Sequence, residues 1–245
     1  SSKIGQDAFQ EADITGATAP FCKHNFLVKN VGELARTFCE AFYIASTGRP
    51  GPVLIDVPVD IQLAETDAYM PINVNIPGYK PTYKGNGNQI KRAAAAIDKA
   101  EQPLIVAGGG VIISKTQKKV AELADTGNIP VAETLMGASA ISSDNPLNLS
   151  MIGVHGAKQA NYALNNADLV ILLGARAADR SLSKNSLNKN AKIIHIDIDP
   201  AEIGKIIFET EKDNPESLVA EQIQRVLASR ANIDTLRTRI RELKL

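Results

Sequence analysis

The chain has 245 residues, 44% hydrophobic and 4% aromatic, and its 27 Lys and Arg balance 27 Asp and Glu. This length suits one large domain, or one domain with part of another. Zero net charge argues against nucleic acid, because nucleic-acid binders neutralise phosphates with excess cations. No apolar stretch approaches the roughly 18 residues that a membrane span requires, so we expect no membrane partner.

The two cysteines, Cys22 and Cys39, form no CxxC pair and have no zinc-type spacing. The first residues also lack the apolar core of a secretory signal. Both observations favour a reducing compartment, which is the cytoplasm or, if the source is eukaryotic, an organelle matrix.

Helical spacing of apolar residues predicts a helix over 31–47, with Gly48 placed to end it. A buried, parallel-type strand, Val53–Val57, follows the turn Gly48–Pro52. One helix and one strand are half of a βαβ unit. We therefore interpret residues 1–62 as the end of an α/β domain, covered by helices on both sides of its sheet.

Residues 63–87 are rich in proline and glycine and lack periodicity, which predicts a linker. Helices and apolar strands then alternate, which predicts an α/β fold with a doubly wound parallel, Rossmann-like sheet over 88–230 and a helical tail over 231–245. The expected helices are 89–100, 115–126, 157–166 and a C-terminal one from about 215; the expected strands are 103–107, 129–134, 149–154, 168–174 and 192–199.

Ligands of such sheets bind beyond the carboxyl ends of the strands. Four of the five predicted strand ends carry glycine, which admits a ligand close to the backbone and leaves N–H groups at helix starts for an anion. Arg176 and Arg180 offer charge-assisted hydrogen bonds, and Asp197 is placed to accept one from a ribose or ribityl hydroxyl. Together these residues predict a dinucleotide site.

Simpler explanations stay open for each feature alone. Gly108–Gly110 is not a G-x-G-x-x-G motif and is also compatible with a plain turn, and His155 with a structural histidine. Arg49 and the pair Asp179–Arg180 are compatible with surface ion pairs. The alternation His195, Asp197, Asp199 suggests a metal trio only weakly, so we predict no metal site and, without a known catalytic motif, no catalytic set.

The chain closely resembles the large catalytic subunit of acetolactate synthase (acetohydroxyacid synthase), a thiamine-diphosphate-dependent family. The resemblance covers roughly residues 4–205. It rests on residues 7–14, 23–28, 47–58, 134–137, 152–156, 160–163 and 195–205.

The resemblance implies that residues 1–62 end a domain that binds the thiamine pyrimidine and that 88–230 form a central FAD-binding domain. Phe9, Gln10 and Lys23 would lie toward the thiamine and its access channel. The implied FAD contacts are Arg49, Gly109, Thr134, Leu135, Ile152, Gly153, Val154, His155, Gly174, Ala175, Arg176, Ala177, Ala178, Asp179, Arg180, Asp197 and Ile198.

The resemblance also implies an activity for the whole enzyme in branched-chain amino-acid biosynthesis, where it decarboxylates pyruvate and joins the two-carbon unit to a second 2-keto acid. Thiamine diphosphate and Mg²⁺ serve the chemistry, and FAD has no net redox part. A homo-oligomer and a regulatory subunit are the implied partners. The family's catalytic glutamate is expected before Ser1, and no Gly-Asp-Gly metal motif occurs, so we expect these residues alone to be inactive.

Three departures from the family are visible: Val59 in place of a lysine, Ala177 and Ala178 in place of Phe-Asp, and a polar stretch over 209–217. They predict weakened flavin binding and keep two other functions open. One is a non-catalytic Rossmann-like scaffold or oligomerisation module. The other is part of a related thiamine-dependent decarboxylase or oxidase, which residues 7–11 and 23–28 argue against.

Overall fold

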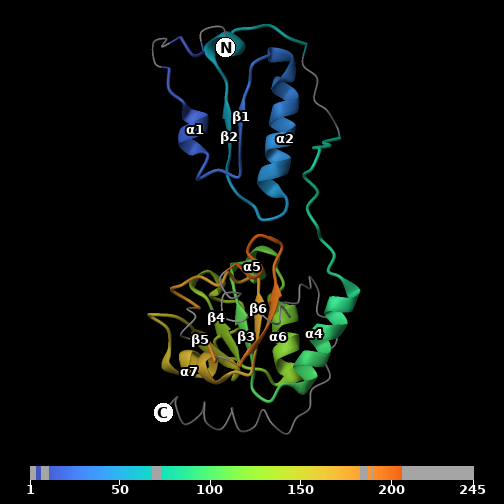
Figure 1. The fold of residues 1–245 in the computed structure, drawn as a ribbon, viewed down its shortest axis with the longest axis vertical. Helices are drawn as coiled ribbons and strands as arrows, with labels where there is room; N and C mark the ends of the chain where they lie inside the picture. Colours follow the sequence, from blue (N-terminus) through green and yellow to red (C-terminus); the bar gives the residue numbers. More distant parts are fainter. Residues whose placement is uncertain (1–3, 7–10, 68–72, 183–186, 189, 206–245) are drawn as a thin grey trace. The chain divides into compact units, whose positions relative to one another are not determined.

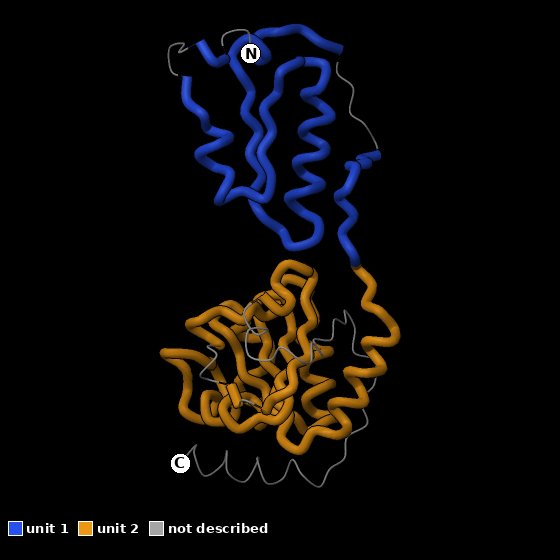
Figure 2. Tube along the Cα trace, in the orientation of Figure 1, with its two compact units in different colours: residues 1–82 blue, residues 83–245 orange. Residues whose placement is uncertain are grey.

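The computed structural model describes residues 4–6, 11–67, 73–182, 187–188 and 190–205. The chain divides into unit 1, Ser1–Thr82, and unit 2, Tyr83–Leu245 (Figure 2). The boundary falls inside the segment predicted as a linker. The helix expected from about 215 and the tail 231–245 lie outside the described residues.

Unit 1 is built on two parallel strands joined through a helix. Its elements are α1 (Ile14–Thr18), β1 (His24–Leu27), η1 (Val31–Glu33), α2 (Leu34–Ser46), β2 (Val53–Asp56) and α3 (Val59–Gln62). Phe26 pairs with Ile55 in the parallel register, and α1 and α2 lie on either side of the strands (Figure 1). The helix and strand predicted for this region are present, and β1 completes the βαβ unit.

Unit 2 has a five-stranded parallel sheet in the order β5-β4-β3-β6-β7. This confirms the predicted doubly wound α/β class. The elements are α4 (Gly87–Lys99), β3 (Pro103–Ala107), α5 (Gly109–Ile113), α6 (Gln117–Gly127), β4 (Val131–Glu133), η2 (Leu135–Gly137), β5 (Asn148–Met151), α7 (Lys158–Asn166), β6 (Leu169–Leu173) and β7 (Lys192–Ile196) (Figure 1).

The sheet of unit 2 separates two apolar clusters. Alternate residues of β3 and β6 point to opposite faces, so Ile105 and Ile171 belong to one cluster, whereas Leu104 and Val170 belong to the other. The side chains of β3 and β6 are buried throughout. This burial is why their sequences are continuous apolar runs, as expected for central strands covered on both faces.

Three strands of unit 2 depart from the predicted bounds by more than one residue at one end. β4 spans 131–133 rather than 129–134, β5 spans 148–151 rather than 149–154, and β7 ends at Ile196. The chain turns away after β5, where Gly153 has φ +107°, and after β7, where Asp199 N–H donates to Asp197 Oδ1 at 2.9 Å. None of the helices in the described ranges has the length and apolar character needed to cross a membrane.

Candidate functional site

The sheet of unit 2 has one topological switch point, between β3 and β6. From β3 the chain proceeds to β4 and β5 on one side, and then returns to β6 and β7 on the other. The loops that leave β3 and β6 therefore diverge at the carboxyl edge, where open α/β sheets bind ligands. The predicted residues Gly174–Arg180 lie in the loop after β6, and Gly109 is the first residue of α5, which follows β3 directly.

Glycines let the two loops touch at this point. A Cβ on Gly108 would lie 2.2 Å from Gly174 O, and one on Gly110 would lie 2.7 Å from Gly174 Cα. Gly110 N–H donates to Gly174 O at 3.0 Å, and Gly174 itself has φ +53°. Loop packing thus requires three of the glycines, and the run is more than a plain turn.

The loop after β4 covers the loop after β3. Gly137 packs on Ala107, where an added Cβ would be 2.2 Å from the carbonyl oxygen. A Cβ on Gly109 would lie 3.1 Å from Met136 Cβ. The predicted residues Thr134 and Leu135 belong to this loop, with Thr134 buried and Leu135 exposed.

Large apolar side chains are exposed along this edge. Leu135, Met136 and Val154 are 73%, 72% and 77% exposed. Exposed apolar groups next to polar loops commonly mark a ligand surface. The FAD contacts implied by the sequence include Leu135 and Val154 but not Met136.

The loops after β5 and β6 are also joined. Val154 N–H donates to Arg180 O at 3.1 Å, and a Cβ on Gly153, where φ is positive, would lie 2.3 Å from the same oxygen. Ile152 is buried, and His155 is exposed. The predicted residues 152–155 and 174–180 are therefore brought together.

The side chain of Asn161, on α7, forms two hydrogen bonds with the turn after β5. Its Oδ1 accepts Gly153 N–H at 2.9 Å, and its Nδ2 donates to Gly153 O at 2.9 Å. The resemblance included Asn161 without giving it a role. Only the folded chain shows that this amide substitutes for a strand partner.

The side chains of 175–180 divide between the core and the solvent. Ala175 and Ala177 are buried in the cluster beneath α7, whereas Arg176, Asp179 and Arg180 are exposed. The departure at Ala177 therefore falls on a packing position, and the two cations predicted to meet an anion are accessible. Ala178 is half-buried.

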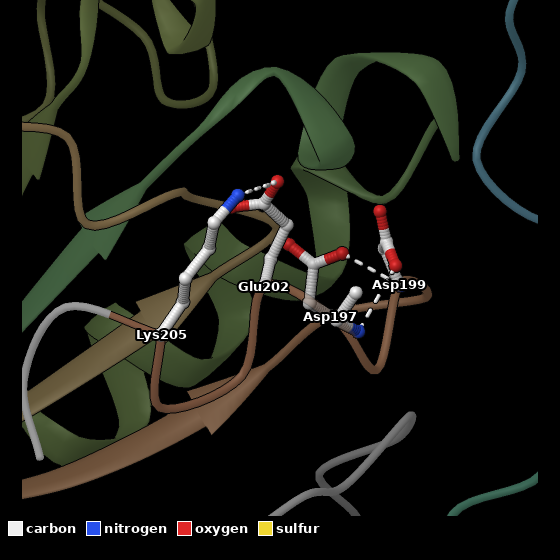
Figure 3. A network of polar contacts seen from close by, with 5 residues as sticks. Asp197, Asp199, Glu202 and Lys205 are labelled. Atoms are coloured by element: carbon white, nitrogen blue, oxygen red, sulfur yellow. Dashed lines mark hydrogen bonds and ion pairs between the residues drawn. The ribbon is translucent and has the colours of Figure 1, made fainter. Parts of the chain in front are cut away.

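The end of β7 joins the site through Gly174, whose N–H donates to Ile196 O at 2.8 Å. Figure 3 shows Asp197, Asp199, Glu202 and Lys205 in the turn that follows. Asp197 is half-buried, and one of its oxygens accepts the Asp199 amide. Ile198 lies between these residues and is also half-buried.

His195 is a core residue. It is 1% exposed, and its Nε2 has no hydrogen-bond partner among the described residues. Burial lowers the pKa of the imidazole below its ordinary value of 6.5, against the opposing field of Asp197. Within the described ranges no group of three His, Cys, Asp or Glu residues could hold a metal ion.

Lys23 has a structural position in unit 1. Its Nζ donates to Ile44 O at 2.6 Å, Thr47 O at 2.5 Å and Tyr79 Oη at 2.8 Å. The ammonium thus binds the carbonyls at the end of α2, where the helix dipole favours a cation. Arg49 is exposed in the turn that follows, and Phe9 and Gln10 lie outside the described residues.

The fold and this edge define a class: a doubly wound α/β domain whose switch point suits a nucleotide-type ligand. The family profile described as "Thiamine pyrophosphate enzyme, central domain" matches residues 90–216. The chain belongs to this thiamine pyrophosphate enzyme family.

Similar curated proteins include several named acetolactate synthase. The chain is 50% identical over 206 residues to "Probable acetolactate synthase large subunit" of Methanocaldococcus jannaschii, an alignment that covers 82% of this chain and 35% of that protein. It is 46% identical over 212 residues to "Acetolactate synthase large subunit" of Buchnera aphidicola, covering 84% and 37%, and 47% identical over 205 residues to "Acetolactate synthase" of Mycobacterium leprae, covering 83% and 33%. The chain thus spans about a third of the length of these relatives.

Proposed function

We propose that the chain is part of the large catalytic subunit of an acetolactate synthase and that unit 2 binds FAD at the carboxyl edge of its sheet. Identities of 46–50% to proteins of that name support the activity. The observation that carries the flavin site is the switch point between β3 and β6, where four glycine-containing strand ends meet.

The residues at this edge fit a flavin dinucleotide. Arg176 and Arg180 are exposed beside the glycine loops and match a diphosphate. Gly109 lets Met136 pack closely on the start of α5, and the exposed Leu135 and Val154 offer apolar contact to a ring. Asp197 is placed for a hydroxyl of the sugar or ribityl chain.

In the whole enzyme, thiamine diphosphate with Mg²⁺ would supply the electron sink for decarboxylation and carboligation of 2-keto acids. The residues of unit 2 would bind and orient the flavin, which is not consumed. We further propose a homo-oligomer with a regulatory subunit, located in the cytoplasm or an organelle matrix.

Titration with FAD tests the site. We expect saturable quenching of flavin fluorescence, and the double variant Arg176→Gln/Arg180→Gln should raise Kd about tenfold, because charge-assisted hydrogen bonds to phosphate are lost. Lys99→Gln is the matched control, since Lys99 is an exposed cation at the end of α4, which leads to the opposite edge of the sheet. Absence of quenching at high protein concentration would instead favour the non-catalytic scaffold.

A chimera tests the activity. We expect the 245 residues alone to form no acetolactate from pyruvate with thiamine diphosphate and Mg²⁺, because they contain no Gly-Asp-Gly motif. Exchanging the aligned 206 residues into the Methanocaldococcus jannaschii protein should preserve acetolactate formation. The unmodified relative is the positive control. A folded chimera that forms no product would contradict the assignment to acetolactate synthase. Turnover by the 245 residues alone would contradict their expected inactivity.

A further inference from the structure

Glu133, the last residue of β4, is a buried carboxylate that the proposed site does not use. It is 8% exposed, and its Oε1 accepts Ile141 N–H at 3.1 Å. Burying a carboxylate is costly unless hydrogen bonds compensate for the lost water. Such a residue at the end of a central strand therefore needs a reason in the structure around it.

The bond from Glu133 to Ile141 closes the base of the loop 134–141. Ala140 and Ile141 are buried in the core cluster on one face of the sheet. The loop therefore leaves the core after Glu133 and re-enters it at Ala140. Within the loop, Gly137 N–H donates to Thr134 O and Ala140 N–H to Gly137 O, both at 2.9 Å. The loop is a compact arch with the carboxylate across its base.

The exposed tip of this arch carries Leu135 and Met136. A second buried polar side chain supports its far end, because Asn148 Nδ2 donates to Ser142 O at 3.2 Å and Asn148 Oδ1 accepts Ser150 N–H at 2.7 Å. Gly137 presses the arch against the end of β3. The position of Met136 above Gly109 therefore depends on how the base is closed.

We propose that Glu133 is a positioning residue for the ligand loop: its carboxylate fixes the arch 134–141 and so holds Leu135 and Met136 against the flavin. The proposal rests on the proposed FAD site. Glu133 does not itself contact the ligand. Without an acceptor for the buried Ile141 N–H, the arch would have to open toward water, and binding would include the cost of closing it again.

The test compares Glu133→Met, which keeps the length and removes the acceptor, with Glu133→Gln, which keeps an oxygen acceptor at the same position. We expect Glu133→Met to raise the Kd for FAD about tenfold and Glu133→Gln to restore it to within about twofold of the original chain. Hydrogen exchange should show the Ile141 amide protected in the original and Gln proteins and exposed in the Met variant.

Asp168→Ala provides the matched control. Asp168 also accepts backbone N–H groups, from Glu101 at 2.7 Å and Gln102 at 2.9 Å, but these contacts lie at the amino edge of the sheet, before β3 and β6. It should lower stability while leaving the Kd for FAD unchanged. If the role of Glu133 is merely structural, Glu133→Met should behave like Asp168→Ala and lower stability without changing the Kd for FAD.

The outcomes separate the two proposals. If the original chain fails to bind FAD, the proposed function is overturned. If it binds and Glu133→Met binds equally well, only the role of Glu133 is overturned. If Glu133→Met does not fold, hydrogen exchange of the original chain decides: added FAD should increase protection over 133–141, and unchanged protection there would overturn the role of the arch.

Discussion

The buried imidazole of His195 connects the core of unit 2 to solution pH. Its pKa is lowered by burial, so the folded protein holds the neutral form at pH values where the unfolded chain already binds a proton. Stability is therefore fully present above the unfolded value of about 6.5 and is lost as pH falls below it.

We expect the free energy of unfolding, measured in urea, to be lower at pH 5.5 than at pH 7.5. His195→Leu should flatten this dependence, because the apolar side chain has no proton to bind. His155→Gln is the control, since His155 is exposed. If the slope in this range is the same in His195→Leu, the source is another group.

At the scale of elements, Lys23 ties three segments of unit 1 together. It caps the end of α2 and reaches Tyr79, 56 positions away, whose hydroxyl also lies 3.0 Å from Thr47 Oγ1. Tyr79 packs edge-to-face on Tyr43 with ring centroids 6.0 Å apart. This cluster fixes the C-terminal turn of α2 and holds the segment that leads to unit 2.

Lys23→Met should destabilise unit 1 by about 2 kcal/mol and Tyr79→Phe by about 1 kcal/mol. The first value is larger because hydrogen bonds from a charged donor contribute about twice as much to stability as those between neutral groups. The measurement is urea denaturation with hydrogen exchange at the Thr47 amide, which donates to Tyr43 O. Lys29→Met, at an exposed position, should change neither. Unchanged Thr47 protection in Lys23→Met would show that the helix end does not need the ammonium.

Sequence patterns predicted the elements that bury continuous apolar runs, and missed those fixed by distant partners. β3 and β6 were found within a residue at each end, because nothing polar interrupts them. β1 was missed because the polar residues His24 and Asn25 occupy half of this short strand and interrupt its apolar pattern. α5 was missed because a run of glycines is typical of a turn. The predicted strand-end residues meet at one edge, as parallel topology requires, but the contacts of Lys23, Glu133 and Asn161 depend on the folded chain.

At the scale of the whole molecule, most of the buried apolar residues in the described ranges belong to unit 2. Both apolar clusters consist of residues from unit 2, between Ala93 and Ile196. In the described part of unit 1 the buried apolar residues are Val28, Ala41, Ile44 and Ile61. Since burial of apolar area is the main favourable term in folding, the two units should differ in stability.

We therefore expect residues 83–245, expressed alone, to fold cooperatively and to keep the thermal transition of unit 2 in the full chain. Calorimetry is the measurement. A piece 83–245 without a cooperative transition would show that the two units fold only together.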